Sequence, residues 1–454
     1  MADVWKSPSV LTIAGVDSSG GAGVAADLKT FASLKFHGAC VVTALTAQNT
    51  RKVYEVHPTP PGFLKRQLEA VFSDLEVKAV KVGMLYAPEA VKVVAYAIRG
   101  RELAVVVDPV LRAAVGDSLA APGVVEAYTE ELLPLATVVT PNIPEAEVFT
   151  NMKIKSFEDM KAAVTSLHEQ GAEAILLKGG HLGGEIVVDL LSQRQGRCEK
   201  FERPRIKVEP HGIGCALSAA LAVHLAQGYK LPQAVRRSEE FIDSLLSFCK
   251  PIGGGLRVAD PLVPLYNEAE RQMVVESIRL SLEIVKAHET KFLPYIAEVG
   301  TQIAMSLPYP TTLADVAAVD GRLKREACSI KISGSIKFGV SSHMARLILT
   351  CIHRNPTIRA AMNLHYEEGL LRALEKAGLT VSAFDRSLEP VETKQTEGAT
   401  IIWGVERAVR VAGRVTDVIY DLGETGKEPM IRILGRNAEE VVEKALRGIN
   451  LRGI

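Results

Sequence analysis

The sequence has few cysteines and no long apolar segment. Its six cysteines are scattered along 454 residues, with no CxxC pair and no spacing typical of a zinc site. The longest apolar runs, such as 216–226, fall well short of a membrane span. The first residues, MADVWKSPSVLTIAG, lack the basic and apolar regions of a signal peptide. These absences predict a reduced cytoplasmic protein that does not enter a membrane.

Net charge is also absent, because 53 Lys and Arg balance 53 Asp and Glu. No global field therefore draws the chain to nucleic acid or to an anionic membrane, and any bound anion must be held by local groups. With 47% hydrophobic and 23% charged residues the composition is that of a folded protein. A chain of 454 residues is too long for one core and predicts two or three domains.

In the first 250 residues, short β-rich runs alternate with helical patterns, which predicts a parallel sheet with helices on both faces. Ligands of such sheets bind beyond the carboxyl ends of the strands. The loops after the expected strands are indeed polar or rich in glycine: AGVDSSGGAG, TAQNT, VGM, DPV, TPN and KGGH. The expected strands are 10–14, 40–45, 79–82, 103–107, 136–140 and 174–177, and the helices include 61–75, 88–99 and 124–133.

The alternation stops near residue 250. A run rich in glycine and proline at 251–266 predicts a linker between a first domain, 1–250, and a second domain, 267–454. The second domain mixes helices and strands, so we expect a separate mixed α/β fold. Its expected helices are 268–288, 344–351, 367–377 and 438–446, and its expected strands are 398–403 and 418–420.

Three loops of the first domain are candidates for chemistry. The glycine-rich segment 17–23 and the Lys178-Gly179-Gly180-His181 turn are each also common as ordinary loops. The segment His211-Gly212-Ile213-Gly214-Cys215 opens an apolar helix, where free N–H groups and the helix dipole favour an anion. A cysteine in this first turn is expected to have a lowered pKa, although it could simply be a small buried residue.

The ordered series of these blocks resembles the hydroxymethylpyrimidine and hydroxymethylpyrimidine-phosphate kinases, ThiD, of the ribokinase-like superfamily. The resemblance covers residues 9–248. It implies a ribokinase-like fold, ATP and Mg²⁺ as cofactors, and a homodimer formed through the kinase domain. The matching blocks are TIAGVDSSGGAGVAADLKTF, ALTAQNT, AVKVGML, VVVDPV, LLPLATVVTPNIPEAE, LKGGH and HGIGCALSAALA.

The resemblance also implies roles for individual residues. Asp27 and Gln48 match residues at the aminopyrimidine, and Cys215 matches the position that faces the hydroxymethyl group. Gly212 and Gly214 match the anion hole for the transferring phosphoryl group. The pocket lining is matched by Gly15, Met84 and Val110, the ATP phosphate region by Asp108, Asn142 and Lys178, and the metal ligand by Glu145.

Two departures from the family pattern concern the phosphate groups. Ile213 stands where that family usually has a hydroxyl residue, which removes polar contacts but leaves the backbone N–H groups. The segment after DPV, 111–117, lacks the lysine often found there. We expect an active kinase whose rate or nucleotide preference differs.

The second domain has no glycine-rich phosphate loop, but it has a set of basic and polar residues. His343, at a predicted helix start after two serines, suits an anion, although serines before a helix are also ordinary caps. Arg322 suits a phosphate clamp, although it could equally be a solvated charge.

Residues 268–450 resemble the ThiN type of thiamine-phosphate synthase domain. The matching segments include EVGTQIAMSLP, KFGVSSHMARLIL, SAFDRSLEP and GKEPMIRILGR. The resemblance implies coupling of hydroxymethylpyrimidine diphosphate to thiazole phosphate with release of diphosphate. Arg322 and His343 are the expected catalytic residues, with Lys337, Arg386 and Lys427 as diphosphate contacts. Gln302 stands where an asparagine is expected, which puts one polar contact in doubt.

Two alternatives remain open at this point. The second domain could be a non-catalytic sensor of thiamine phosphate or a related ligand, although no DNA-reading segment accompanies it. The first domain could phosphorylate a pyridoxal-type alcohol, since the fold accepts several alcohols. The contexts of Gln48 and Cys215 favour the pyrimidine.

Overall fold

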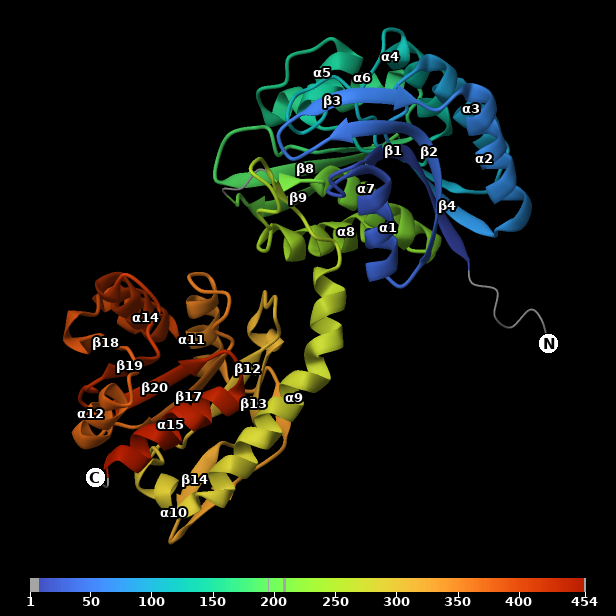
Figure 1. The fold of residues 1–454 in the computed structure, drawn as a ribbon. Helices are drawn as coiled ribbons and strands as arrows, with labels where there is room; N and C mark the ends of the chain where they lie inside the picture. The colour runs from blue at the N-terminus through green and yellow to red at the C-terminus, as the bar shows by residue number, and fades with distance from the viewer. Residues whose placement is uncertain (1–7, 195, 207–209, 453–454) are drawn as a thin grey trace. The chain divides into compact units, whose positions relative to one another are not determined.

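The computed structural model describes residues 8–194, 196–206 and 210–452. The chain divides between Pro264 and Leu265 into two compact units, unit 1 and unit 2. Each has its own sheet and hydrophobic core (Figure 1).

Unit 1 is built on a nine-stranded sheet in the order β3-β2-β1-β4-β5-β6-β7-β8-β9. The six strands from β2 to β7 in this order run parallel, while β3, β8 and β9 are antiparallel to their neighbours. This confirms the predicted mainly parallel sheet. The strands are β1 (Ser9–Asp17), β2 (His37–Gln48), β3 (Val53–Pro58), β4 (Val77–Val82), β5 (Ala104–Val107), β6 (Val138–Val139), β7 (Ala174–Leu177), β8 (Ile186–Gln193) and β9 (Cys198–Pro204).

Helices cover both faces of this sheet, so its central strands are almost wholly apolar, as buried parallel strands should be (Figure 1). α1, α7 and α8 pack together on one face, and the remaining helices, with η1, cover the other. The elements are α1 (Gly23–Ser33), α2 (Pro61–Asp74), α3 (Pro88–Ile98), α4 (Val124–Ala127), η1 (Tyr128–Leu132), η2 (Leu133–Leu135), α5 (Ile143–Thr150), α6 (Phe157–Glu169), α7 (Ile213–Ala226) and α8 (Leu231–Leu246).

The segment expected to be a linker, 251–266, belongs to unit 1 for most of its length. β11 (Arg257–Val258) pairs with β10 (Pro210–His211), and the Leu256 N–H donates to the Thr50 carbonyl at 2.9 Å. α9 (Val263–Ala287) begins before the boundary between the units. A Cβ at Gly255 would lie 2.0 Å from the Thr50 carbonyl oxygen. The lack of a side chain here therefore lets the segment pack closely against the 49–51 turn.

Unit 2 is a mixed α/β fold, as predicted. Its seven-stranded sheet has the order β16-β13-β12-β17-β20-β19-β18, and all pairs are antiparallel except β18 with β19. The strands are β12 (Ile303–Ser306), β13 (Val316–Val319), β16 (Ile336–Phe338), β17 (Ala360–His365), β18 (Val381–Ala383), β19 (Val418–Asp421) and β20 (Met430–Gly435), with a separate hairpin of β14 (Leu323–Glu326) and β15 (Ser329–Ile332).

Two helical layers enclose this sheet, and alternate strand residues therefore belong to two cores. On β20, Ile431 and Ile433 join the core with α9, α12 and α15, while Leu434 joins the core with α11 and α14. The elements are α10 (Glu289–Phe292), η3 (Leu293–Tyr295), η4 (Leu313–Asp315), α11 (Ser342–Ile352), α12 (Glu368–Lys376), η5 (Arg386–Leu388), α13 (Val391–Gln395), α14 (Ala399–Ala412) and α15 (Ala438–Arg452).

The strand predicted at 398–403 was wrong, because these residues open helix α14. The β-branched run Thr400-Ile401-Ile402 misled the prediction. The longer pattern is helical, since the buried positions 401, 404, 405, 408 and 409 repeat with a helical period and form one face. None of the helices that the structure describes is both long and apolar enough to cross a membrane.

Candidate active site

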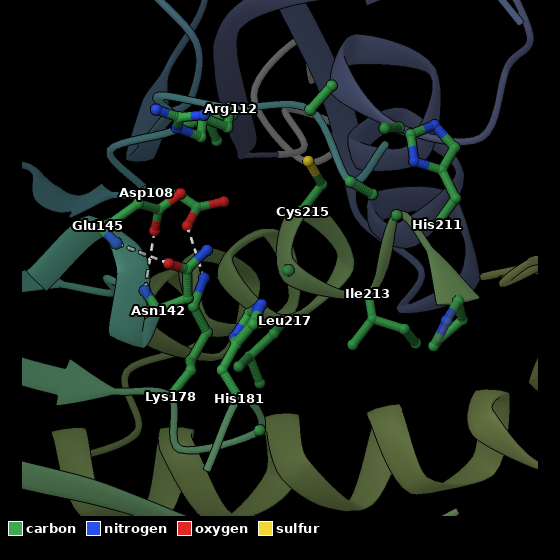
Figure 2. A pocket seen from close by; sticks show the side chains of 18 of the residues that line it. Asp108, Arg112, Asn142, Glu145, Lys178, His181, His211, Ile213, Cys215 and Leu217 are labelled. Carbon is green, nitrogen blue, oxygen red and sulfur yellow. Dashed lines mark hydrogen bonds and ion pairs between the residues drawn. The ribbon is translucent and has the colours of Figure 1, made fainter. Parts of the chain in front are cut away.

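A cavity of about 1030 Å³ opens at the carboxyl ends of the unit 1 strands (Figure 2). Its walls come from the loops after β1, β2, β4, β5, β6 and β7 and from the start of α7. The predicted residues that line it are Gly15, Gln48, Met84, Asp108, Val110, Asn142, Glu145, Lys178, Gly212, Gly214 and Cys215. Asp27 is not among them.

Asp108 and Lys178 form an ion pair in this cavity. The Lys178 ammonium donates to Asp108 Oδ1 at 2.9 Å, and the hydroxyls of Thr140 and Ser218 donate to the same carboxylate at 3.1 and 3.2 Å (Figure 2). Burial alone would lower the pKa of Lys178, but the carboxylates of Asp108 and Glu145 outweigh it and raise that pKa. The cavity therefore keeps a fixed cation beside a carboxylate with three donors.

Asn142 and Glu145 begin α5 as a capping box. Asn142 accepts from the Glu145 N–H, and the Glu145 carboxylate accepts from the Asn142 N–H, both at 2.8 Å. Burial raises the pKa of Glu145 to about 7, and the charge of Asp108 adds to this while Lys178 opposes it. The two buried carboxylates thus carry negative charge that a bound cation would stabilise.

The start of α7 is held against the glycine-rich loop after β1. Gly212 has φ +92°, and a Cβ at this position would lie 1.9 Å from the carbonyl oxygen of Gly21. Only glycine fits this approach. Since α7 begins at Ile213, its first N–H groups have no acceptor within the helix and are available to an anion.

The predicted low pKa of Cys215 was wrong. Burial raises this pKa to about 11, and the negative charges of Asp27 and Asp108 also raise it. Lys81 and the N–H of Gly23 favour the thiolate but do not compensate. The thiol lies in the cavity wall near carboxylates rather than in bulk water, so at neutral pH it remains protonated.

Asp27 lies beneath the cavity wall. Its carboxylate is fully buried and accepts from Thr12 Oγ1 at 2.6 Å and from the Lys81 ammonium at 2.9 and 3.1 Å. Thr12 and Lys81 are paired neighbours on β1 and β4, so both reach the same helix-covered face. Lys81 contributes to the cavity wall, whereas Asp27 holds it in place.

Sequence reasoning missed three further residues of this cavity. His211 Nε2 forms a hydrogen bond with Asp17 Oδ2 at 2.7 Å, and this contact joins the loop after β1 to the start of α7. Arg112 lines the cavity in the segment that lacks the family's lysine, and thus supplies a cation there (Figure 2). Lys81 is the third. An aspartate in the first loop and a histidine before the helix were visible signals, but their pairing across 194 residues was not.

A second cavity, of about 200 Å³, lies in unit 2. It brings together two predicted residues, Arg322 and His343, near the start of α11. The remaining lining residues are Val299, Gly300, Gln302, Ser341, Met344, Asn363 and Met430.

Arg322 occupies a strained turn. Its φ is +67°, in the left-handed region that non-glycine residues seldom adopt, and it follows Gly321 at φ +105°. Its Nη1 donates to the Val299 carbonyl at 2.7 Å, which directs the guanidinium along the cavity wall. A left-handed arginine at a cavity is typical of functional placement.

Two buried arginines share one carboxylate next to this cavity. Arg386 donates to Asp421 at 2.5 Å, and Arg432 donates to it at 2.7 Å. Arg432 is 1% exposed, and its Nε has no hydrogen-bond acceptor among the described residues. Sequence reasoning predicted Arg386 but missed Arg432 and Asp421.

Desolvation and the nearby arginines together disfavour the charged form of His343. Desolvation in its crevice, followed by the charges of Arg432, Arg386 and Arg322, lowers the pKa of His343 to about 3. As a whole residue, His343 is nevertheless exposed. At neutral pH the imidazole is therefore uncharged, with one ring nitrogen that donates a hydrogen bond and one that accepts.

The other predicted residues of unit 2 lie elsewhere. Lys337 pairs with Asp320 on the surface at 2.8 Å, Lys427 lies in an exposed turn, and neither lines the cavity. Gln302 lines it but is structural: its amide donates to the Val319 carbonyl at 2.8 Å and accepts from the Val319 N–H at 3.0 Å.

Comparisons with known proteins agree with this division. Residues 17–257 match the phosphomethylpyrimidine kinase family, and residues 277–447 match the thiamine-phosphate synthase ThiN family. The bifunctional thiamine biosynthesis protein ThiDN of Methanocaldococcus jannaschii is 33% identical over 96% of this chain and 97% of its own length.

The chain belongs to the ThiDN family. It is a bifunctional enzyme of thiamine biosynthesis with a kinase domain followed by a thiamine-phosphate synthase domain. This supports a catalytic second domain over the sensor alternative.

The kinase domain has separate relatives. The hydroxymethylpyrimidine/phosphomethylpyrimidine kinase of Aquifex aeolicus is 38% identical over 55% of this chain and 98% of its own. Among solved structures, an ADP complex of Bacillus subtilis pyridoxal kinase is 33% identical, with a TM-score of 0.52 over 57% of this chain and 98% of that chain. The fold is thus that of ribokinase-like kinases.

Proposed function

We propose that one site on this chain phosphorylates hydroxymethylpyrimidine and then its monophosphate with ATP, and that a second site couples the diphosphate to thiazole phosphate. The observation that carries the proposal is that the start of α7, Lys178 and Cys215 meet in one cavity in a chain that also contains a synthase domain. The cavity of about 1030 Å³ has room for a nucleotide and a small acceptor together.

At the acceptor end, Gln48 would bind the aminopyrimidine edge, because an amide both donates and accepts. Gly15, Met84 and Val110 would line the ring pocket; a Cβ at Gly15 would lie 2.9 Å from the Met84 sulfur, so the glycine leaves room there. Asp27 would act indirectly, through Lys81. Cys215 would orient the hydroxymethyl group as a thiol.

At the donor end, Lys178 and the N–H groups from Gly212 to Gly214 would stabilise the transferring phosphoryl group. A Cβ at Gly214 would lie 3.4 Å from the Lys178 nitrogen, so the ammonium stands beside the helix start. Phosphoryl transfer depends mainly on such positioning and charge neutralisation. Asn142 would orient the nucleotide phosphates.

Magnesium fits the carboxylates of Asp108 and Glu145. Mg²⁺ prefers one or two carboxylates together with phosphate oxygens and water, and these two buried carboxylates line the same cavity. No group of three or more acidic, His or Cys residues in the described ranges could hold a metal, so phosphate must complete the site. When bound, the ion would neutralise charge on the phosphates.

In the synthase site, Arg322, His343 and Arg386 would stabilise the leaving diphosphate, with Arg432 adding charge from below. Departure of diphosphate leaves a delocalised cation on the pyrimidine methylene, which the thiazole nitrogen captures. The reaction therefore needs positive charge at the leaving group. The two guanidiniums that share the Asp421 carboxylate, together with Arg322 in the cavity wall, would supply it. Lys337 and Lys427 would contribute only as exposed charges at a distance.

Two further features belong to the proposal. The six cysteines are all free thiols, which suits the cytoplasm, where ATP is available. Resemblance to the kinase family suggests a homodimer formed through unit 1, and light scattering of the purified chain would measure its mass.

The coupled reaction tests the proposed function. Hydroxymethylpyrimidine, thiazole phosphate, ATP and Mg²⁺ are expected to yield thiamine phosphate with the full chain, and chelation of Mg²⁺ is expected to stop it. Accumulation of the pyrimidine diphosphate alone would instead show that unit 2 only binds a ligand. Pyridoxal in place of the pyrimidine is expected to be a poor acceptor.

Cys215→Ala is expected to lower kcat/KM for the pyrimidine about tenfold, less than the 10²–10⁴ typical of a lost general base. With a pKa of about 11, Cys215 is almost wholly protonated at neutral pH, so very little thiolate is present to act as a base. The KM for ATP and the shape of the pH profile from 6 to 9 should not change. A thousandfold loss, together with the disappearance of one limb of the pH–rate profile, would show that Cys215 is the base. Cys215→Ser is the matched control.

A further inference from the structure

The loop after β7 consists of residues 179–184, Gly-Gly-His-Leu-Gly-Gly, and is referred to below as the 179–184 loop. Four of its six residues are glycine, which lose more conformational freedom on ordering than any other residue. It directly follows Lys178, and residues 180–184 line the kinase cavity (Figure 2). A defined wall at this place therefore needs contacts from outside the loop.

Arg205 supplies those contacts. Its Nε donates to the Gly184 carbonyl and its Nη1 donates to the Gly180 carbonyl, both at 2.7 Å. Its Nη2 donates to the Leu182 carbonyl, and its backbone N–H donates to the Glu185 carbonyl at 2.7 Å. One planar guanidinium thus binds three alternate carbonyls of the loop through charge-assisted hydrogen bonds.

The base of the loop is fixed independently. The Gly179 N–H donates to Asp189 Oδ1 at 2.7 Å, and a Cβ at Gly179 would lie 2.0 Å from the Val188 oxygen. Asp189 itself pairs with Arg203 at 3.1 Å. Further out, the Leu182 side chain packs against the core of unit 1 and its N–H donates to the Gly179 carbonyl at 2.9 Å, whereas a Cβ added at Gly180, Gly183 or Gly184 would meet no atom within 4 Å. The three glycine-flanked carbonyls of the outer loop are held by Arg205.

The charge of Arg205 faces backbone carbonyls in the part of the chain that the structure describes. No ion pair of Arg205 with a carboxylate is found among residues 8–194, 196–206 and 210–452. Among the described residues, carbonyl oxygens accept its hydrogen bonds, and its positive charge lies in the wall of the cavity. This charge would favour an anionic ligand at the same end as Lys178.

We propose that Arg205 is a positioning residue of the kinase, which holds the 179–184 loop in the shape that receives the nucleotide phosphates beside Lys178. The proposal rests on the proposed placement of those phosphates. Arg205 does not need to touch the phosphates, because three of its nitrogens already donate to the loop. It reduces the conformational freedom that the loop would otherwise lose when the nucleotide binds.

The test compares Arg205→Met with Arg205→Lys and with Arg236→Met in the full chain. Arg236 of α8 serves as the control. It is exposed, and its guanidinium carbon lies 6.0 Å from the centre of the Phe201 ring. Without nucleotide, amide exchange of 180–184 in Arg205→Met is expected to quicken at least about tenfold, with 211–226 unchanged. KM for ATP should rise about tenfold and KM for the pyrimidine less than twofold. Arg205→Lys should be intermediate, because an ammonium cannot span three carbonyls.

Unchanged exchange in the loop, or faster exchange with an unchanged KM for ATP, would overturn the proposal. If Arg205→Met does not fold, the same two measurements on Arg205→Lys decide, and the absence of an effect there counts against it. Failure of the phosphate placement itself has a different signature. Lys178→Met would then leave ATP kinetics intact while Arg205→Met still loosened the loop.

Discussion

Lys178→Met should reduce kcat for phosphorylation of the pyrimidine by about 10²–10³, the loss seen when one donor to a developing oxyanion is removed. The Lys178 ammonium stands beside the start of α7, and we propose that it stabilises the transferring group. In this variant Asp108 keeps its hydrogen bonds from Thr140 and Ser218 but loses its ion pair, so some loss of stability is expected beside the loss of rate. Steady-state kinetics with varied ATP would measure the effect.

Lys178→Arg is the matched variant, since it retains the charge but not the compact shape, and should keep an intermediate rate. The variant Lys178→Met, supplied with ready-made pyrimidine diphosphate, should form thiamine phosphate at the rate of the wild type. A loss of less than fivefold in kcat would show that the phosphates bind elsewhere in the cavity.

Asp421→Asn should destabilise unit 2 by about 3–5 kcal/mol and abolish coupling, while phosphorylation continues. Asp421 is the shared partner of Arg386 and Arg432, so its loss leaves two buried guanidiniums without a counter-charge. Hydrogen exchange across 265–452 would measure the destabilisation, and product analysis would measure coupling. Glu326→Gln, which breaks the exposed pair with Lys331, is the control and should cost less than about 1 kcal/mol.

Acid should reproduce part of this effect. Burial alone would raise the pKa of Asp421, but the charges of Arg432 and Arg386 outweigh it, and the pKa is lowered in the folded state. The stabilisation is therefore fully present above the unfolded-state pKa of about 3.9 and declines as pH falls below it. Asp421→Asn should lack this acid limb. Asp421→Asn combined with Arg432→Met should regain folding without regaining coupling, and a double variant as unstable as the single would contradict the charge argument.

The sequence predicted the kinase cavity well because its parts are local. Each strand-end loop carries its own polar residues, and a parallel sheet brings those loops to one edge whatever the details of packing. The capping box at Asn142 and Glu145 and the glycines before α7 can likewise be found within a few residues. Asp108 and Lys178 followed from the same reasoning, although they are 70 residues apart.

What failed depends on burial and on distant partners. The helix start at Cys215 suggested a thiolate, but desolvation and two carboxylates from other elements reversed the sign. Asp27 was expected to face the substrate. Its carboxylate instead forms a buried ion pair with Lys81, which is 54 residues away in the sequence. Arg432 was hidden within an apolar strand, and only the pairing of β19 with β20 places it against Asp421.

The approach of Gly212 to Gly21 has a consequence for redesign of this enzyme. A carbonyl of one loop fills the space where the other would carry a side chain, and the bond between His211 and Asp17 joins the same two segments. Both segments line the kinase cavity, and the second contains the glycines that we propose form the phosphoryl hole. Attempts to change the acceptor by grafting the 17–23 loop from another kinase should therefore transplant 211–215 with it, because the two segments behave as one exchangeable module.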